Sequence, residues 1–491
     1  MDLEHLSRLQ FAVTTVYHYL FVPLSISLSL FTALLQTAHV RARRRVRQGR
    51  AVVGDPDRWG RLSLLTGKLL MVTFAVGVVT GLVQEFQFGL SWSAFARFYG
   101  DVFGPVLAIE GMLAFFLEAT FLGLWWFGRD RLPRTVHLAT IWVVAVGTTT
   151  SAFVILAANS FLQNPVAYAV DPLTGRARLT SFRDLLLDEV NLAAFPHTFA
   201  GAVMAGGALV MAVGVWHLLR GGHDAASETF AAFRALSRFG AWATLVGGGV
   251  LALSGDVLGK VITQVQPMKM AAAEALWSSR TGAPFSILAY APPGTDRPTF
   301  SLEVPGLLSF LAKGSFTARV SGLAELQHAY TAQFGPGDYT PWVPVAFWSF
   351  RLMIGVGTTA ALVALVHLWV TRSGRPLEVD SRLATSVLWS VPVLPLLPAA
   401  ANSFGWIFTE TGRQPWLAFG LFRTADGVSP GLTVPEVLVS LAAFTVVYGA
   451  LAWAWTVLVL RLVRNGLPEL PADRADAGHV AADAPDVALG Y

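Results

Sequence analysis

Long apolar stretches, separated by short polar segments, recur along most of the 491-residue chain. A helix that crosses the hydrocarbon layer of a membrane needs about 20 predominantly apolar residues. The stretches that meet this requirement cover residues 11–36, 62–83, 103–127, 135–158, 194–219, 236–258, 343–370, 384–408 and 435–463. This pattern predicts an all-α integral membrane protein with about nine transmembrane helices.

The charged residues between these stretches indicate how the helices are oriented. Residues 37–61 contain eight arginines but only two acidic residues, Asp55 and Asp57. An excess of arginine in a short loop marks the cytoplasmic side. Alternation of nine spans then predicts an external N-terminus and a cytoplasmic C-terminus, and it places the arginine-containing loops near 128–134 and 371–383 in the cytoplasm.

The chain divides into one membrane domain and a C-terminal tail. The membrane domain extends over residues 1–463, and residues 259–342 within it form its only long external loop. Residues 464–491 are rich in alanine and aspartate and contain no aromatic residue before Tyr491. Such a segment cannot bury enough apolar area to fold, so we expect a disordered cytoplasmic tail.

Composition supports a membrane protein and excludes several kinds of site. Hydrophobic residues make up 54% of the chain and charged residues only 13%, against roughly 25% in soluble domains. The net charge of +4 comes from clusters in short loops, which argues against a nucleic-acid-binding surface. The chain has no cysteine, which excludes disulfides, iron–sulfur clusters, thiolate ligation of haem and covalent attachment of haem.

Ionisable and ligating side chains inside the spans are candidates for function, because a charge costs roughly 3 kcal/mol at the bilayer centre. His18 lies two or three turns into the first span, and His197 follows Pro196 at the outer start of the fifth. Each histidine is either a hydrogen-bonded contact between helices or a metal ligand. Met353 lies in an apolar helix and, taken alone, is best explained by packing.

Two groups of residues with carboxylates are further candidates for function. Glu110 and Glu118 lie about 12 Å apart in the third span, and we interpret this pair as a path for protons. Trp406 and Glu410 have an i, i+4 spacing at the outer end of the eighth span, which places both on one face. Glu410 either pairs with Arg413 beside an interfacial tryptophan or faces a cofactor.

Taken together, these segments resemble subunit I of the cytochrome bd quinol oxidases. The resemblance extends from about residue 6 to residue 463, and the short external loop resembles the short-loop subgroup. The matching motifs are LSRLQFA (6–12) with YH (17–18), GLVQEFQFG (81–89), DVFGPVLAIEG (101–111), FFLE (115–118), ANSF (158–161), QPMKMAAAE (266–274), FWSFRLM (347–353) and GRQPW (412–416).

The resemblance implies three haems: a low-spin haem b, a high-spin haem b and a haem d. His197 and Met353 match the axial ligands of the low-spin haem b, and Arg351 of the same motif is expected among the cofactor-binding residues. A thioether ligand raises the potential of the iron and so favours electron transfer from quinol. His18 and Glu410 match the ligands of the other two haems, and the resemblance leaves open which of them holds haem d.

The resemblance also implies roles for residues around the haems. Trp406 is expected beside the haem of Glu410, and Arg413 is expected to neutralise a haem propionate or that carboxylate. Lys269 and Glu274 match the quinol-binding pair, in which the carboxylate accepts a quinol proton and the ammonium favours its ionised form. The alternative for these two residues is a solvated ion pair at i, i+5.

One residue departs from the family. Ala119 stands where the relatives usually have a serine, directly after the residue that matches Glu118. A hydroxyl is therefore missing beside this carboxylate, which leaves the detailed route of the protons open.

The features together predict an enzyme that oxidises quinol at the outer face and reduces dioxygen to water. Protons would come from the cytoplasm through Glu118 and then Glu110, so charge is separated without a pump. The expected partner in the bacterial cell membrane is subunit II of the oxidase, with a small single-helix subunit as a further candidate. A proton-coupled transporter would show inverted repeats, which the sequence lacks, and a haem-free scaffold would not need intact ligands.

Overall fold

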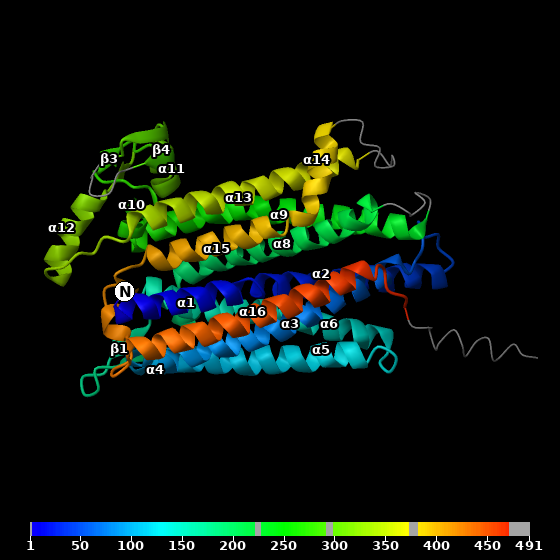
Figure 1. Cartoon of the computed structure of the whole chain (residues 1–491), viewed down its shortest axis with the longest axis horizontal. Coiled ribbons are helices and arrows are strands. Elements are labelled where there is room, and N and C mark those ends of the chain that lie inside the picture. Colours follow the sequence, from blue (N-terminus) through cyan, green and yellow to red (C-terminus); the bar gives the residue numbers. More distant parts are fainter. Residues whose placement is uncertain (1, 221–226, 291–297, 373–381, 471–491) are drawn as a thin grey trace, which may run out of the picture.

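The computed structural model describes residues 2–220, 227–290, 298–372 and 382–470, which form a bundle of long helices (Figure 1). The apolar stretches become helical because a backbone inside a membrane must satisfy its hydrogen bonds within its own segment. The helices of the bundle are α1 (Leu3–Tyr19), α2 (Val22–Arg47), α3 (Arg58–Leu90), α4 (Ser93–Ile109), η1 (Glu110–Phe116), α5 (Leu117–Phe127), α6 (Arg134–Gln163), α8 (Glu189–Leu219), α9 (Glu228–Val265), α13 (Val343–Val370), α14 (Arg382–Ser390), η2 (Val391–Val393), α15 (Leu396–Thr411) and α16 (Val434–Arg464).

Eight helical segments of the described residues are long and apolar enough to cross a membrane, and they correspond to eight of the nine predicted spans. The remaining prediction, residues 384–408, is not one continuous helix. It consists of α14, a short 3-10 turn and α15. Pro392 and Pro395 fall at this interruption, where their missing N–H groups disfavour a continuous α-helix. The count of nine spans therefore stays a prediction.

Two other spans contain local irregularities. The first is divided at Leu20 and Phe21 into α1 and α2. The third is divided by the π-helix η1, which begins at Glu110 and ends just before the start of α5. The expectation of one regular α-helix through both Glu110 and Glu118 is therefore wrong. π-Helical turns are frequent at functional sites, and this one separates two candidate residues.

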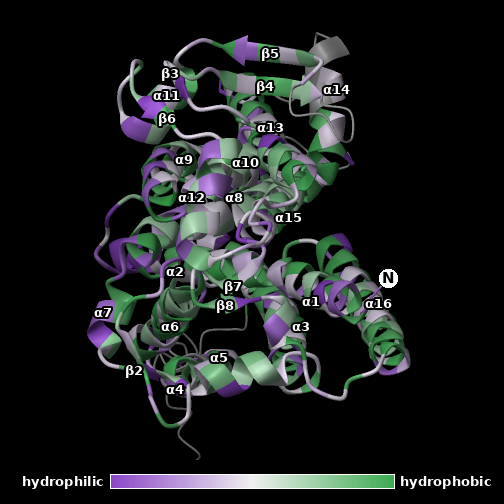
Figure 2. Ribbon diagram, turned by 90° about the vertical axis from the view of Figure 1, so that its left-hand side faces the viewer, coloured by the Kyte–Doolittle hydropathy of each residue, from purple (hydrophilic) through white to green (hydrophobic). Residues whose placement is uncertain are grey.

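Seen along their axes, the helices form two neighbouring groups (Figure 2). One group contains α8, α9, α13 and α15, and the other contains α1 to α6 with α16. Helices α2 and α6 also pack against α8 and so join the groups. Within the first group α8 and α9 approach closely at two glycines of α8. A Cβ atom at Gly207 would lie 2.6 Å from the backbone nitrogen of Thr244, and one at Gly214 would lie 2.6 Å from that of Ser237. Small residues permit such contacts between membrane helices.

The segment 259–342, expected as an external loop, folds into small elements after α9 ends at Val265. Its strands β4 and β5 form an antiparallel hairpin that pairs Phe285 with Val304. This segment and the N-terminus lie at one end of the bundle, opposite residues 37–61 (Figure 1). The short elements of the chain are β1 (Tyr168–Val170), β2 (Ala177–Leu179), α7 (Phe182–Leu186), α10 (Pro267–Ala273), β3 (Arg280–Thr281), β4 (Phe285–Tyr290), β5 (Phe300–Val304), α11 (Leu307–Lys313), β6 (Arg319–Val320), α12 (Leu323–Phe334), β7 (Trp416–Ala418), β8 (Phe422–Arg423) and η3 (Ala425–Gly427).

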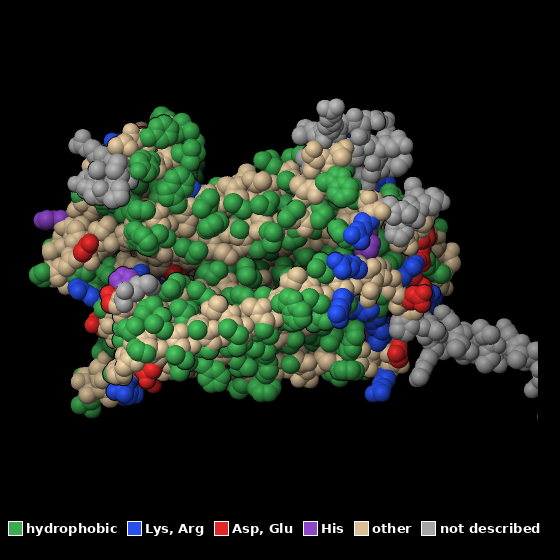
Figure 3. All heavy atoms as spheres, in the orientation of Figure 1, with side chains coloured by type: hydrophobic (Ala, Val, Ile, Leu, Met, Phe, Trp, Pro, Cys, Tyr) green, Lys and Arg blue, Asp and Glu red, His purple; other side chains and the backbone are tan. Residues whose placement is uncertain are grey.

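The surface agrees with a protein that crosses the membrane several times. Apolar side chains cover the middle of the molecule, whereas lysines and arginines gather mainly at one end (Figure 3). This distribution is what a membrane-embedded bundle with a positively charged cytoplasmic side would show. Of the predicted tail, Arg464 still belongs to α16, and residues 471–491 lie outside the described residues.

The predicted orientation can be tested with two single cysteines, because the chain has none of its own. Val53 in the arginine-rich loop is 98% exposed, and Leu173 at the opposite end is 94% exposed. A membrane-impermeant maleimide added to spheroplasts should label the Leu173→Cys variant and spare Val53→Cys, whereas both should react after lysis. Labelling of Val53→Cys alone in intact spheroplasts would reverse the orientation.

Candidate functional site

His18 lies near the end of α1 and faces α3. Its Nδ1 atom is 2.9 Å from the Thr80 hydroxyl, and a Cβ atom at Gly81 would be 3.3 Å from the ring. Helix α1 begins at Leu3, before the predicted start of the span at residue 11, so His18 lies about 22 Å from the beginning of the helix. The contact at Nδ1 orients the ring and leaves Nε2 available for a ligand.

A cavity of ≈ 2030 Å³ lies beside His18. Sites for one small molecule usually have about 300–1,000 Å³, so this space is about twice the size of a large single site. The predicted residues that line it are His18, Glu110, Glu118, Trp406, Glu410 and Arg413. The structure therefore brings together the side chains that were expected at the dihaem site and on the proton path.

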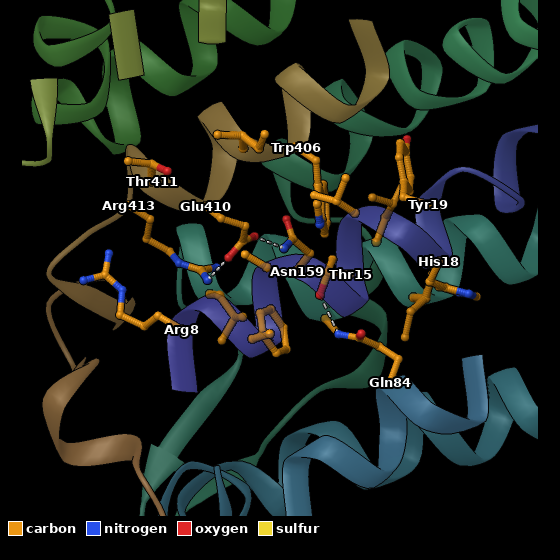
Figure 4. Close-up of a pocket in the computed structure, with 18 of the residues that line it drawn as sticks. Arg8, Thr15, His18, Tyr19, Gln84, Asn159, Trp406, Glu410, Thr411 and Arg413 are labelled. Atoms are coloured by element: carbon orange, nitrogen blue, oxygen red, sulfur yellow. Dashed lines mark hydrogen bonds and ion pairs between the residues drawn. The ribbon is translucent and has the colours of Figure 1, made fainter. Parts of the chain in front are cut away.

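Glu410 lies on the cavity wall between two partners (Figure 4). Asn159 donates a hydrogen bond of 3.0 Å to one carboxylate oxygen, and Arg413 forms an ion pair with the other. Two further nitrogens of Arg413, Nε and Nη1, are buried and have no partner among the described residues. The same holds for the indole N–H of Trp406, whose ring stacks on Tyr19. Glu410 thus both pairs with Arg413 and faces the cavity, and unpaired donors beside it suit an anionic ligand.

A chain of hydrogen bonds connects Glu410 with Lys269. The Lys269 ammonium donates to Gln163 at 2.7 Å, and the Gln163 amide donates to Asn159 at 2.8 Å. Asn159 in turn donates to Glu410. Sequence reasoning assigned no role to Asn159 or Gln163. Their i, i+4 spacing at the end of a predicted span was the available signal, because it places two amides on one helix face.

Glu110 and Glu118 both face α6. Ser151 donates a hydrogen bond of 3.0 Å to Glu110, and the Thr148 hydroxyl lies beside Glu118. Ser151 and Thr148 are three residues apart on α6, so they share one face of that helix. Helix α6 therefore supplies one hydroxyl group beside each carboxylate. The hydroxyl of Thr148 lies beside Glu118, where Ala119 cannot supply one.

His197 and Met353 lie in the other helix group, and neither lines the cavity. The His197 Nδ1 atom on α8 is 3.2 Å from the Ser254 hydroxyl on α9. Met353 on α13 points at Gly405 on α15, where a Cβ atom would come within 2.9 Å of the thioether sulfur. A larger residue at position 405 would displace this sulfur, so the glycine provides the space that the Met353 side chain occupies.

The two residues lie at a similar height in the bundle. Helices α8 and α15 run in opposite directions and approach each other where a Cβ atom at Gly201 would be 2.9 Å from the Asn402 amide oxygen. His197 lies about one turn from Gly201, and Gly405 lies about one turn from Asn402 toward the same end. This arrangement is compatible with His197 and Met353 as ligands of one group between the helices.

Lys269 and Glu274 do not form a pair with each other. Glu274 makes a buried ion pair with Arg351, with contacts of 2.6 and 3.2 Å, while Lys269 binds Gln163. The alternative of a solvated ion pair is therefore wrong, since Lys269 is 2% and Glu274 3% exposed. Arg351 was expected to bind a cofactor, and its described hydrogen bonds go to Glu274 and to backbone oxygens of Ala273 and Ser286.

Burial changes the acid–base properties of both residues. Loss of hydration, with a smaller effect of Arg413, lowers the pKa of Lys269 to about 7. Loss of hydration raises the pKa of Glu274 to about 7, against the opposing effect of the Arg351 guanidinium. Both groups therefore exchange protons near neutral pH, as a site that accepts and passes on protons requires.

Comparisons with known proteins identify the family of this chain. The family model described as cytochrome bd terminal oxidase subunit I matches residues 6–467. The chain is 40% identical over 463 residues to cytochrome bd ubiquinol oxidase subunit 1 of Bacillus subtilis (strain 168), with 94% of this chain and 93% of the relative covered. It is 33% identical to cytochrome bd-II ubiquinol oxidase subunit 1 of Escherichia coli (strain K12), with 95% and 97% covered.

A solved structure has a similar fold. The bd oxidase from Geobacillus thermodenitrificans contains a chain that matches this one with a TM-score of 0.80 at 25% identity. The match covers 94% of this chain and 99% of that chain, so it includes both helix groups.

The buried ion pair between Arg351 and Glu274 should contribute to stability. Breaking such a pair typically costs about 3–5 kcal/mol, because one charge is left without a partner. We expect Arg351→Met to lower the apparent melting temperature of the purified protein clearly. Arg319→Met, which breaks an exposed ion pair with Glu325, is the control and should leave the melting temperature unchanged. Equal shifts in both variants would contradict a structural role for the buried pair.

Proposed function

The chain belongs to the cytochrome bd terminal oxidase subunit I family, and from this premise we propose that it is the haem-carrying subunit, which oxidises quinol at the outer face and separates charge across the membrane. As a family member it is a quinol:oxygen oxidoreductase. The observation that carries the proposal is the large cavity. Inside a largely apolar bundle it collects a histidine, several carboxylates and cationic donors that lack partners among the described residues.

We assign two b-type haems and one haem d to this chain. His197 and Met353 would hold the low-spin haem b, and His18 and Glu410 would hold the high-spin haem b and haem d in an order that we leave open. Bound haem supplies one-electron transfer and the reduction of oxygen. The residues present fit these groups, because the cavity beside His18 and Glu410 is large enough for more than one ligand and a thioether and an imidazole are chemically suited to a low-spin haem iron.

The surrounding side chains would orient and neutralise these groups. The hydroxyls of Thr80 and Ser254 contact Nδ1 of His18 and His197, which directs Nε2 of each ring away from them. The unpaired Arg413 nitrogens can donate charge-assisted hydrogen bonds to a carboxylate such as a haem propionate.

Quinol would be oxidised beside the folded loop, where Glu274 accepts a proton. Arg351 holds this carboxylate in place, and burial keeps its pKa near 7, so the carboxylate can both bind and release a proton. Lys269 comes from the same short helix α10 and is joined through Gln163 to the wall of the cavity. The two candidate sites are therefore physically connected.

Protons for water formation would reach the cavity through Glu118 and then Glu110. Their order follows from the predicted topology, in which the third span runs inward, and the hydroxyls of Ser151 and Thr148 lie along this line. The chain would work with subunit II in the bacterial plasma membrane, and a small single-helix subunit is a further candidate partner.

The ligand assignment predicts that His197→Ala and Met353→Leu each remove or convert the low-spin haem, because each deletes one axial ligand. Reduced-minus-oxidised absorption spectra of the purified variants measure this, and quinol oxidation should fall together with the low-spin bands. Met211→Leu is the control, since Met211 is a methionine on α8, the helix of His197, that has no proposed role as a ligand. Unchanged low-spin bands in both ligand variants would refute the assignment.

The quinol site predicts a bell-shaped pH dependence of kcat/KM for quinol. Glu274 has to be ionised, so the rate should rise with pH through about 7, and Lys269 has to be protonated, so the rate should fall above about 7. Glu274→Gln should slow quinol oxidation by about 10²–10⁴-fold without loss of haem. Lys269→Met should cost less and remove the alkaline decline. If both variants keep the wild-type pH profile and KM, Lys269 and Glu274 do not belong to the quinol site.

The proton path predicts that Glu118→Gln slows oxygen reduction while the haem spectrum is retained, because glutamine keeps the volume but cannot exchange a proton. Turnover and membrane potential in proteoliposomes measure the effect. Glu303→Gln changes an exposed loop carboxylate and serves as the control. If Glu118→Gln retains wild-type turnover and membrane potential, Glu118 is not on an essential path.

A further inference from the structure

A second hollow, of ≈ 720 Å³, lies at the arginine-rich end of the bundle, remote from the haem and quinol residues. It lies between the beginnings of α3 and α9 and the end of α13. Its cationic lining residues are Arg58, Arg234, Arg238 and Arg372. Trp59, Phe230, Phe239 and Trp242 complete most of the wall. Four arginines therefore line one hollow, and none of the described residues that line it carries a carboxylate.

The positive charge of this hollow is only partly neutralised by the described residues. Arg58 pairs with Glu228 at 2.8 Å, yet its Nε atom is buried without a partner among the described residues. Arg234 and Arg238 both donate to the Thr371 backbone oxygen, which positions them without cancelling their charge. Among the described residues, no carboxylate forms an ion pair with Arg234, Arg238 or Arg372. An anion in the hollow would satisfy these donors.

The face of α9 that begins in the hollow continues as an apolar stripe. Arg234, Arg238, Trp242, Val246 and Val250 follow one another at i, i+4 spacing, so each side chain lies next to the following one on a ridge that winds slowly around the helix. Beyond the arginines the stripe is exposed, with Trp242 at 55% and Val246 at 58%. The helix thus presents two cationic groups, then an aromatic ring, and then aliphatic side chains at membrane depth.

We propose that this hollow binds the phosphate headgroup of an anionic phospholipid, with an acyl chain lying along the stripe on α9. Basic pockets between transmembrane helices on the cytoplasmic side are suited to anionic headgroups. Free phosphate would satisfy the same arginines, so phosphate is the shared chemistry of both ligands. The continuous apolar stripe favours the lipid, because a free ion would leave that stripe without a role in binding.

Native mass spectrometry of the purified oxidase complex in detergent tests the proposal, with dioleoylphosphatidylglycerol and dioleoylphosphatidylcholine as probes. The phosphatidylglycerol should bind more tightly to the wild type. Arg234→Gln with Arg238→Gln should weaken its binding about thirtyfold, since each arginine near a membrane surface contributes roughly fivefold. Arg41→Gln with Arg45→Gln is the matched control, because these arginines have the same i, i+4 spacing, are exposed and lie at the same end on α2.

A second variant separates charge from folding. Arg234→Lys with Arg238→Lys loses the same guanidinium contacts to Thr371 but keeps the charge, so phosphatidylglycerol should still bind within a few-fold of the wild type. Equal binding of the two lipids, or equal losses in the α9 and α2 glutamine variants, would overturn the site. Complete displacement of phosphatidylglycerol by excess inorganic phosphate would show a free-anion site and would overturn the lipid assignment.

Discussion

The polar chain from Lys269 to Arg413 determines how the two candidate sites of this protein are placed. It joins α10 to α6 through Gln163 and then joins α6 to α15 through Asn159 and Glu410. Each member is at least partly buried, so loss of one link would leave a polar group unpaired in surroundings of low dielectric constant. Such a network holds three segments of the chain in one arrangement, although they are far apart in sequence.

Two separate ion pairs distinguish the surroundings of Glu410 and Glu274. Glu410 has Arg413 and Asn159 as partners and faces the cavity, whereas Glu274 has Arg351 and faces the folded loop. Because each anion has its own cation, neither depends on the other for its charge. In the proposed function, quinol would give its proton to Glu274, while Glu410 would remain beside the oxygen-reducing groups.

Much of this architecture was predictable from sequence. The apolar stretches gave eight of the spans, since length and composition alone decide whether a helix can cross a membrane. The motifs selected six side chains that line the cavity. The interruption before α15 had a visible signal in Pro392 and Pro395. The π-helix at Glu110 had no such signal, because it depends on packing rather than on local pattern.

The partners of Lys269 and Glu274 could not be predicted in the same way. Their spacing suggests a mutual contact, but the contact of Lys269 with Gln163 spans 106 positions and that of Glu274 with Arg351 spans 77. Tertiary packing alone brings these residues together. The hydroxyls of Ser151 and Thr148 could not be predicted as partners either. They lie on α6, whereas the carboxylates that they contact, Glu110 and Glu118, lie on the third span.

In the proposed function, this single chain holds three haems at two separate places in the bundle. Haem extraction and the reduced-minus-oxidised spectrum of the purified wild-type oxidase test it most directly. We expect protohaem and haem d in a ratio of about two to one, with low-spin and high-spin b-type components in the spectrum. A protein that folds and assembles in the membrane but yields no haem d, or no low-spin b component, would contradict it.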